Sequence, residues 1–387
     1  MGQLIAGPFA GLQLAGFGAE VIKVEPPSGG DPMRTWRKLD AGTSLWWYSL
    51  ARNKKSITLN LRDPAGPELI RQLVGAGVDV LIENFRPGRM EEWGLSFEEL
   101  REINPRLVMT RVSGYGQTGP YAKRPGFASV AEGIGGLRYV TGDPDRPPVR
   151  SSVSLGDTLA GLHAAMGTLL AIYQRDAGGS GRGQLVDAAI YESVFNMMES
   201  LLPEYDRLGH VRERTGAKLE GIVPSNTYQC SDGAYVIVGG NGDSIFQRLM
   251  IAIGRDDLAN DPRVARNPGR VEHEAEIDAA IEGWVSARTS AEVLESLTAA
   301  EVPAGPINSI EDIARDPQYE SRGMFESVNL PSGSPLKIPR MVPILSETPA
   351  RTRWIGPELG AHNEEVYGGL LGMREDAIRD LRARGVI

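Results

Sequence analysis

V-D-V-L-I-E-N-F-R-P-G-R, residues 78–89, places a short run of Val, Leu and Ile directly before a loop that carries two arginines. Three other runs have the same form, at 19–25, 56–61 and 106–114. Helix-length segments such as P-A-G-P-E-L-I-R-Q-L-V (64–74) separate them. Short apolar runs that alternate with helical segments predict strands of a mostly parallel sheet, so the expected fold class is α/β. Ligands of open α/β sheets bind in the loops after the strands.

The sequence changes character beyond about residue 200. Y-Q-C-S-D-G-A-Y-V-I-V-G-G (228–240) predicts a hairpin whose turn is 231–233, and helical patterns follow at 244–253 and 274–300. We therefore expect a smaller α+β domain, after which the Pro-rich and then helical C-terminal part returns to the first domain. The predicted boundaries are 1–200 and 325–387 for the large domain, 220–320 for the small domain, and 200–220 and 320–340 for the linkers.

Composition excludes several classes of function. Hydrophobic residues make up 41% of the 387 residues and charged residues 24%, as in soluble globular proteins. A net charge of −9 disfavours a nucleic-acid partner. Cys230 is the single cysteine and the four histidines are isolated, so neither a disulfide nor a metal site is expected. No apolar run approaches the roughly 20 residues that span a bilayer, and no signal peptide precedes the first strand, so we expect a cytoplasmic protein without membrane contact.

Two glycine-rich segments are candidates for phosphate sites. G-G-N-G-D-S (239–244) closes a predicted strand and opens a predicted helix, so its backbone N–H groups could face an anion. It lacks the spacing and the lysine of a P-loop, and a tight turn that needs positive φ is the favoured interpretation. G-F-G-A-E (16–20) does not fit the dinucleotide fingerprint, which disfavours a nicotinamide dehydrogenase.

Three arginines lie in loops that follow predicted strands. They are Arg34 in S-G-G-D-P-M-R (28–34), and Arg86 and Arg89 in E-N-F-R-P-G-R (83–89). A planar guanidinium donates in pairs to phosphate or carboxylate, so the three together suggest an anion site. Each one taken singly is better explained as a solvated loop residue.

Asp157 begins an otherwise uncharged apolar segment, S-V-S-L-G-D-T-L-A-G-L-H-A-A-M-G (152–167). Leucines at helical spacing predict a helix over 156–174 with Asp157 in its first turn. Local sequence favours a structural role, because a carboxylate there accepts backbone N–H bonds and Ser154 resembles the start of a capping box. The same position suits a nucleophile, since the helix amides keep it ionised and Gly156 and Gly161 would leave room for a bulky reactant.

The order of motifs resembles the class III CoA-transferase family, which includes formyl-CoA transferase, carnitine CoA-transferase and α-methylacyl-CoA racemase. The match runs nearly from end to end. The motifs that carry it are A-G-P-F-A (6–10), G-A-E-V-I-K-V-E-P-P (18–27), G-D-P-M-R (30–34), N-K-K-S-I-T-L-N-L (53–61), E-N-F-R-P-G (83–88), S-G-Y-G-Q-T-G-P (113–120), L-G-D (155–157), G-R-G-Q (181–184) and V-P-A-G-P-I (302–307).

The resemblance implies a site and an architecture. It makes Asp157 the covalent nucleophile, acyl-CoA and a carboxylic acid the substrates, and coenzyme A the bound group, with no metal. It also implies a Rossmann-like large domain and an interlocked homodimer. The implied CoA contacts are Ile5, Ala6, Leu59, Asn60, Leu61, Arg62, Asn84, Phe85, Arg86, Arg124, Pro125, Gly126 and Phe127. The implied substrate loop is Gly239, Gly240, Asn241 and Gly242.

Two departures from the family pattern bear on these expectations. Racemase members have a histidine where this chain has Phe127, which favours transfer over racemisation. Members also have a first strand before the segment that corresponds to 2–8, and here Met1 stands at that point, so the strand is missing or the start is trimmed. The alternatives that stay open are an acyl-CoA racemase or isomerase and a noncatalytic acyl-CoA-binding protein.

The segment R-T-G-A-K-L-E-G-I-V-P-S-N-T-Y (214–228) resembles the branch that uses succinyl-CoA and other short dicarboxylates. Arg212 or Arg214 could hold the distal carboxylate of such a substrate by a bidentate pair. The alternative, that both are solvated linker residues, has equal weight.

Overall fold

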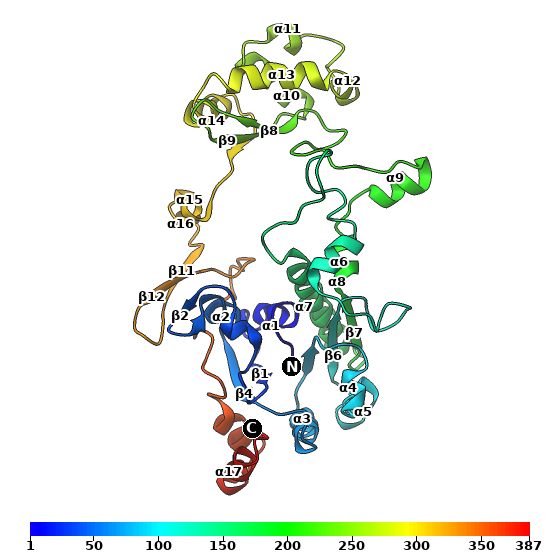
Figure 1. Cartoon of the computed structure of the whole chain (residues 1–387), viewed down its shortest axis with the longest axis vertical. Coiled ribbons are helices and arrows are strands. Elements are labelled where there is room, and N and C mark those ends of the chain that lie inside the picture. The colour runs from blue at the N-terminus through cyan, green and yellow to red at the C-terminus, as the bar shows by residue number, and fades with distance from the viewer. The chain divides into compact units, whose positions relative to one another are not determined.

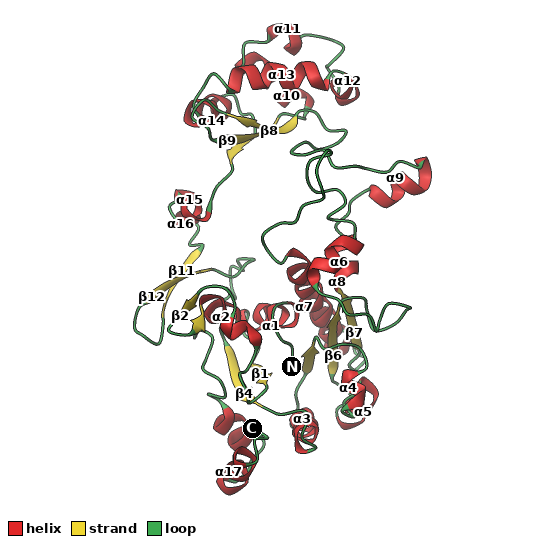
Figure 2. Ribbon diagram, in the orientation of Figure 1, coloured by secondary structure: helices red, strands yellow, loops and turns green.

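A computed structural model describes all residues 1–387 and divides the chain into two units, whose elements Figure 1 labels. Unit 1 comprises Met1–Leu137, Ser151–Glu199 and Glu320–Ile387, and unit 2 comprises Arg138–Arg150 and Ser200–Tyr319. Helices and strands occur in both, so the fold class is mixed α/β, as the sequence predicts (Figure 2).

Unit 1 contains two parallel sheets. The first pairs β1 (Val21–Glu25) with β4 (Lys54–Thr58), and the second has the order β5 (Val80–Glu83), β6 (Val108–Ser113), β7 (Leu185–Ala189). The predicted strands at 19–25, 56–61, 78–84 and 106–114 are therefore confirmed to within a few residues. β7 was not predicted. β1 and β5 are not hydrogen-bonded to each other, so the two sheets remain separate.

Helices cover both faces of the second sheet. On one face, α3 (Ala65–Gly75) and α5 (Phe97–Ile103) bury a cluster that includes Leu73, Leu100 and Met109. On the other face, α1 (Ala6–Gly16) and α7 (Leu155–Asp176) pack side by side through small residues, among them Ala10 and Ala164. Small side chains let two helix backbones approach closely, which is why this layer holds few large residues.

The C-terminal part of the chain packs on β4 in unit 1. The Tyr367 hydroxyl donates to the carbonyl of Thr58 (2.7 Å), and the Asn60 N–H donates to the carbonyl of Val386 (2.7 Å). The other elements of unit 1 are η1 (Pro32–Thr35), β2 (Leu39–Asp40), β3 (Thr43–Ser44), α2 (Leu45–Leu50), α4 (Arg89–Glu92), α6 (Ala128–Ile134), α8 (Ile190–Phe195), β11 (Phe325–Asn329), β12 (Pro335–Pro339), η2 (Glu364–Leu370, a π-helix) and α17 (Glu375–Ala383).

Unit 2 is built on a three-stranded antiparallel sheet in the order β10 (Ala304–Pro306), β9 (Tyr235–Gly239), β8 (Ser225–Gln229). The predicted hairpin is confirmed, and Gly233 supplies the positive φ (+83°) of its turn. The pattern at 274–300 becomes two helices, because Thr289 caps the second with a capping box. The helices are α9 (Leu201–Leu208), α10 (Asp243–Ala252), α11 (Asp256–Ala259), α12 (Asn267–Glu272), α13 (Glu274–Val285), α14 (Ser290–Ala299) and α15 (Ile310–Ile313). The short helix α16 (Pro317–Ser321) crosses the boundary between the units at Tyr319.

One helix, α7, is long and apolar enough to cross a membrane by length and composition, so the expectation that no segment approaches that length was wrong. This is weak evidence for a membrane, because core helices of soluble proteins pass the same test. In unit 1 the helix packs on α1, β6, β7 and α8.

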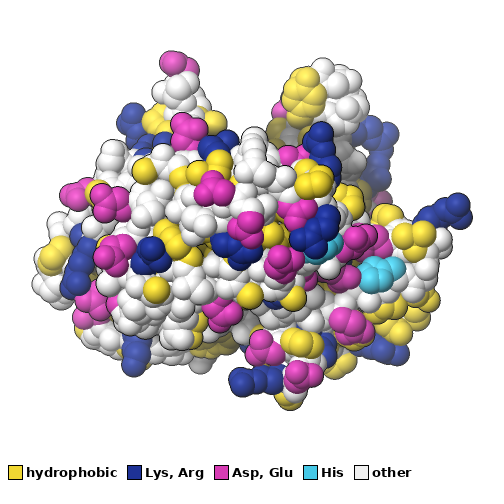
Figure 3. Space-filling model, turned by 90° about the horizontal axis from the view of Figure 1, so that it is seen from above, with side chains coloured by type: hydrophobic (Ala, Val, Ile, Leu, Met, Phe, Trp, Pro, Cys, Tyr) yellow, Lys and Arg dark blue, Asp and Glu magenta, His cyan; other side chains and the backbone are white.

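The surface mixes charges of both signs. On the face that Figure 3 shows, Lys and Arg side chains alternate with Asp and Glu, and hydrophobic side chains are scattered among them. No continuous basic stripe of the kind that follows a nucleic-acid backbone crosses this face.

Candidate active site

Asp157 lies half-buried in the first turn of α7, so the predicted helix is confirmed. The expected capping box is wrong, because the side chain of Ser154 makes no capping hydrogen bond. Instead the N–H of Gly156 donates to Oε1 of Glu132 on α6 (3.2 Å). Glu132 is only 2% exposed, and the sequence analysis missed it. The available signal was a lone carboxylate in the uncharged run A-S-V-A-E-G-I-G-G (128–136).

Gly156 and Gly161 do not open space for a reactant, and that prediction was wrong. A Cβ on Gly156 would meet Cγ of Glu132 at 3.2 Å and the side chain of Ile190 at 3.2 Å. A Cβ on Gly161 would meet the carbonyl of Ala6 at 2.8 Å and the ring of Phe9 at 3.0 Å. Both glycines serve close packing of the helices around Asp157, because their missing side chains point into neighbouring protein atoms.

The start of α1 lies beside the start of α7. Ile5 precedes the helix and Ala6 is its first residue, and both are buried. The close approach of Ala6 to Gly161 places the α1 start one turn along α7 from Asp157. The first N–H groups of a helix have no acceptor within the helix, so two helix starts bring positive partial charge to this region.

Asn84 holds the segment that leads into α1. Its Oδ1 accepts from the N–H of Gln3 (2.7 Å), and its Nδ2 donates to the carbonyl of Gln3 (2.8 Å). The ring of Phe85 turns away and packs edge-on against Trp93, with centroids 5.2 Å apart. Of the three predicted contacts at 84–86, Arg86 alone has an exposed side chain.

The loop at 123–127 approaches the ends of β5 and β6. Nη2 of Arg86 donates to the carbonyl of Lys123 (2.9 Å), and Gly126 lies against Gly114. The exposed guanidinium of Arg124 stacks on Tyr121, 3.7 Å from the ring centroid. The structure therefore brings Arg86 next to the loop that carries Arg124 and Gly126.

Pro125 and Phe127 belong to the same loop and are exposed, Phe127 to 71% of its surface. Phe127 precedes α6 and offers no group that could transfer a proton.

The predicted contacts at 59–62 extend from β4, in the other sheet. Leu59 is buried in the core and Leu61 packs against the same cluster, so neither side chain is available to a ligand. The side chain of Arg62 is exposed, and Oδ1 of Asn60 accepts from its backbone N–H (3.1 Å).

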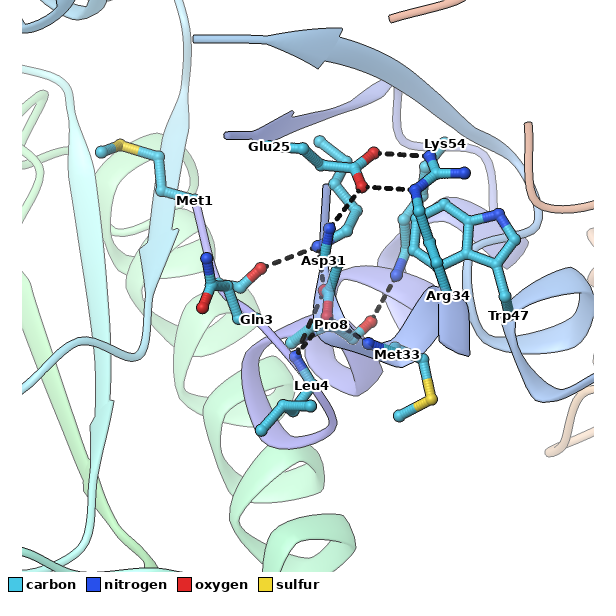
Figure 4. Close-up of polar contacts among 12 residues, drawn as sticks. Met1, Gln3, Leu4, Pro8, Glu25, Asp31, Met33, Arg34, Trp47 and Lys54 are labelled. Carbon is cyan, nitrogen blue, oxygen red and sulfur yellow. Dashed lines mark hydrogen bonds and ion pairs between the residues drawn. The ribbon is translucent and has the colours of Figure 1, made fainter. Parts of the chain in front are cut away.

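Arg34 does not take part in an anion site, and the suggestion that it would was wrong. Its Nε and Nη2 donate to the two carboxylate oxygens of Glu25 (2.8 and 2.9 Å), and its guanidinium stacks 3.8 Å from the ring centroid of Trp47 (Figure 4). Burial raises the pKa of Glu25, but hydrogen bonds from Arg34 and the charge of Lys23 outweigh it and the pKa lies below its usual value. Arg89 is likewise paired, with Glu92.

The glycine loop of unit 2 is anchored. The N–H groups of Gly239 and Gly240 donate to the carbonyls of Pro303 (2.9 Å) and Pro224 (3.0 Å). None of its three glycines has positive φ, so the tight-turn interpretation was wrong. Gly240 is glycine because a Cβ would lie 2.5 Å from Leu249.

Arg270, which is fully buried, donates to the carbonyl of Asn241 (2.7 Å) and to the carboxylate of Asp243 (2.9 Å). Asp243 follows Gly242 at the start of α10, so the helix start that might have faced an anion already holds the chain's own carboxylate.

Arg212 and Arg214 are engaged within unit 2 and are not simply solvated. Nη2 of Arg212 donates to Glu204 (2.7 Å), and Nη1 of Arg214 donates to the carbonyl of Tyr139 (2.7 Å). A substrate carboxylate would therefore compete with these internal partners for the two guanidinium groups.

The sequence model of CoA-transferase family III matches residues 1–363. The chain belongs to this family. Succinyl-CoA–D-citramalate CoA-transferase of Chloroflexus aurantiacus is 49% identical over 388 residues, which cover 100% of this chain and 96% of the relative. The beta subunit of succinyl-CoA–L-malate CoA-transferase from the same organism is 44% identical and covers 99% and 95%. A CAIB/BAIF family protein from Brucella suis has the same fold, with a TM-score of 0.81, 34% identity and coverage of 96% and 97%.

The protein is accordingly a class III CoA-transferase, an enzyme that moves CoA from an acyl-CoA thioester to a carboxylic acid. Its substrates carry CoA, and no group of three or more His, Cys, Asp or Glu side chains gathers in a way that could hold a metal ion.

Proposed function

We propose that this enzyme exchanges CoA between short dicarboxylic acids, with succinyl-CoA or a similar thioester as donor, and that Asp157 carries the acyl group and then CoA. The observation that carries the mechanism is the half-buried carboxylate of Asp157 in the first turn of α7, beside the start of α1. The substrate class rests on two relatives, 49% and 44% identical over the whole chain, which are succinyl-CoA-dependent transferases of citramalate and malate.

In the first step a carboxylate oxygen of Asp157 attacks the thioester carbonyl. A C–O bond forms, the C–S bond breaks, and the products are an aspartyl mixed anhydride and CoA thiolate. The thiolate then attacks the carbonyl carbon of Asp157, which releases the donor acid and leaves an aspartyl-CoA thioester. No proton needs to be transferred, because each nucleophile and each leaving group is an anion.

The acceptor acid repeats these steps in reverse. Its carboxylate attacks the aspartyl thioester and releases CoA thiolate, which then attacks the acceptor carbonyl of the new anhydride. Asp157 leaves as a carboxylate and the acceptor leaves as its CoA thioester. One thioester replaces another, so ATP is not required.

Each attack creates an oxyanion, and helix-start N–H groups can stabilise it. Those of α1 at Ala6 and those of α7 near Asp157 are the candidates, because the two helix starts adjoin. Glu132 would position the α7 start by its hydrogen bond to Gly156. The substrate loop would comprise Gly239, Gly240, Asn241 and Gly242. The hydrogen bond from Arg270 to the carbonyl of Asn241 would hold it in place, so it would not be a free lid.

We assign CoA binding to the loops that follow the strands. Arg86 and Arg124 supply exposed guanidinium groups for phosphate. The hydrogen bond from Arg86 to the carbonyl of Lys123 brings the loops that carry them together. Leu59, Leu61 and Phe85 would contribute backbone atoms, because their side chains pack inward. The further contacts in this assignment are Ile5, Ala6, Asn60, Arg62, Asn84, Pro125, Gly126 and Phe127.

The finer architecture is part of the same proposal. Unit 1 would be a doubly wound, Rossmann-like domain, with the large domain at 1–200 and 325–387 and the small domain at 220–320, and two chains would interlock as a cytoplasmic homodimer. An exposed apolar helix supports the dimer: α9 buries none of its residues and presents Leu202, Tyr205 and Leu208 to the surface. Light scattering that gives the mass of one chain would contradict it.

The covalent step is tested by trapping. Incubation with succinyl-CoA followed by borohydride should reduce the aspartyl thioester, and peptide mass spectrometry should place the change on Asp157. Asp206→Ala, an exposed aspartate on α9, is the matched control and should be trapped equally. Trapping on another residue, or none while turnover continues, would overturn the mechanism.

The substrate class is tested separately. A panel of acyl-CoA donors against mono- and dicarboxylic acids, followed by mass spectrometry, should show faster transfer to short dicarboxylates than to monocarboxylates of equal length. Equal rates would remove the dicarboxylate assignment and leave the covalent step untouched.

A further inference from the structure

A buried carboxylate that the proposed mechanism does not use lies in the loop after β1. It belongs to Asp31 of the motif G-D-P-M-R (30–34) and is 1% exposed. Nζ of Lys23, which is also buried, donates to its Oδ2 (2.6 Å). A buried ion pair is favourable only if further hydrogen bonds satisfy its remaining lone pairs. The other partners of Asp31 therefore show what this carboxylate holds in place.

The carboxylate of Asp31 binds the backbone at two places. The N–H of Met33 donates to its Oδ1 (2.9 Å) at the start of η1. The N–H of Leu4, 27 residues before Asp31, lies 3.0 Å from Oδ1 and 3.2 Å from Oδ2 (Figure 4). Nζ of Lys23 also donates to the carbonyl of Gly2 (2.8 Å). The ion pair therefore ties the segment that leads into α1 to the loop after β1.

Leu4 has a backbone conformation that leucine rarely adopts. Its φ is +61°, in the left-handed region, where a side chain is unfavourable. Such a conformation persists only where the surrounding contacts enforce it. The backbone of Gln3, one residue earlier, is held by two hydrogen bonds with the side chain of Asn84 (2.7 and 2.8 Å). Asp31 supplies the contact at Leu4 itself, so its carboxylate holds the turn in this conformation.

The turn at Leu4 sets the direction in which α1 begins. Ile5 alone separates Leu4 from the first residue of the helix. Pro8 has no N–H, so the donors of the first turn that lack an acceptor within the helix are those of Ala6 and Gly7. Both N–H groups move with the turn, because the helix backbone that carries them is rigid.

We propose that Asp31 is a positioning residue for the transfer of CoA. Together with Lys23 it keeps Leu4 in the left-handed conformation, and it thereby aims the first N–H groups of α1 at the oxyanion that forms beside Asp157. Asp31 itself touches no reactant. A displacement of about 1 Å within a catalytic site can cost roughly 100-fold in rate. This inference rests on the proposed function, since it requires the start of α1 to face the reacting carbonyl.

The hydrogen bond to Leu4 is tested with two double variants, both of which lack the buried charges. Lys23→Met with Asp31→Asn keeps a carbonyl oxygen that can accept from the Leu4 N–H, whereas Lys23→Met with Asp31→Leu has a similar shape and no acceptor. The second variant should have a kcat roughly 10- to 100-fold below that of the first, with the KM for succinyl-CoA within about threefold, because the oxyanion forms only during the reaction. Equal kcat values, or a loss that lies in KM, would overturn the proposal.

A glycine at position 4 separates positioning from stability. Glycine adopts positive φ without steric cost, but Leu4→Gly also removes a side chain that packs against the cluster of Met33 and Trp47. In the background of Lys23→Met with Asp31→Leu, it should therefore raise kcat by roughly threefold or more while it lowers the melting temperature. A purely structural role of Asp31 predicts no recovery of kcat, and that result would overturn the proposal.

Glu20→Ala is the matched control. It removes another pair between a lysine and a carboxylate in unit 1, that of Lys55 with Glu20 (2.9 Å), but the carboxylate of Glu20 is exposed. This variant should leave kcat and KM unchanged, and a loss equal to that of the Leu variant would overturn the proposal.

Borohydride trapping on Asp157 distinguishes a failure of this inference from a failure of the proposed function. If the unsubstituted enzyme turns over and is not trapped on Asp157, the proposed mechanism is wrong. If it is trapped there and the two double variants have equal kcat values, the covalent step stands and the role of Asp31 alone is overturned.

Discussion

Two helices of this enzyme have the dipeptide Gly-Asp at or next to their start, and the two dipeptides have different partners. Gly156 and Asp157 are the second and third residues of α7 in unit 1, whereas Gly242 directly precedes α10 in unit 2 and Asp243 is its first residue. At α10 the carboxylate is held by Arg266 (2.6 Å) and by buried Arg270 (2.9 Å). These hydrogen bonds keep the pKa of Asp243 below its usual value.

At α7 the neighbours of Gly156 are a carboxylate and apolar atoms. Glu132 accepts from Gly156, and Gly156 also packs against Ala128 and Ile190. The residue before Asp157 is thus held by another acid, at a helix start whose first N–H groups carry positive partial charge. The contrast teaches that the same dipeptide at a helix start is bound by arginines through its carboxylate in one place, and is held by a neighbouring acid through its glycine N–H in the other.

Removal of each aspartate in turn should give the largest difference. Asp157→Ala should lower kcat by roughly 10⁴-fold or more, because the covalent route is lost. Asp243→Ala should keep activity within about tenfold, since it touches only the helix start and its arginines. Steady-state rates and CoA affinity measure both. Similar losses of activity in the two variants would show that the two aspartates do not differ in their role.

Arg270→Met should destabilise unit 2 by about 2–4 kcal/mol, because the carbonyls of Val223 and Asn241 lose their buried donor. Arg266→Met is the matched control, since Arg266 pairs with the same aspartate but is exposed. Urea unfolding followed by hydrogen exchange at 225–239 measures the effect. Equal stability of the two variants would show that burial of Arg270 is not what anchors this helix start.

Glu132→Ala should lower kcat by about 10- to 100-fold with little change in CoA affinity, because the α7 start loses the acceptor that positions it. Glu132→Gln keeps a carbonyl oxygen in that place and should retain more activity. A change in kcat alone would support the role of Glu132 in positioning the α7 start. A change confined to melting temperature would make Glu132 a packing residue.

The smallest effect is the pH dependence of Asp243. Its pKa is lowered in the folded state, so its contribution to stability is present above the unfolded value of about 4 and is lost as the pH falls through the folded pKa. Asp243→Asn should reduce the pH dependence of the melting temperature of unit 2, and only in that acidic window. A reduced pH dependence of the melting temperature near neutral pH would contradict the arginine contacts.

The sequence predicted most of the elements, because hydrophobic periodicity and turn residues act locally. The strands of unit 1, the hairpin with Gly233 and the helix that begins near Asp157 all followed from such patterns. It did not predict β7, since L-V-D-A-A (185–189) is too short and mixed to stand out. It also missed Glu132, because that residue is 25 positions from Asp157 and reaches the neighbouring Gly156 only through the packing of α6 on α7.

Side-chain partners were the least predictable part of the site. Arg34 and Arg86 both follow strands and looked alike, yet one is buried against Glu25 and Trp47 and the other is exposed beside Lys123. Guanidinium chemistry suits either outcome, so only the positions of neighbouring acids decide between them. The glycines at 156, 161 and 240 behaved in the same way, since each was small for packing and not for ligand access.

The sequence by itself determined the α/β class, the family and the place of Asp157 at a helix start, because these depend on local patterns and on the order of motifs along the chain. The tertiary structure decided what each charge does: how arginines hold Asp243 at a helix start, which arginine is exposed, and that Lys54 is buried against the carbonyl of Pro8. The physical reason is that the energy of a charge depends on burial and on the groups within a few ångströms, and those groups come from distant parts of the chain.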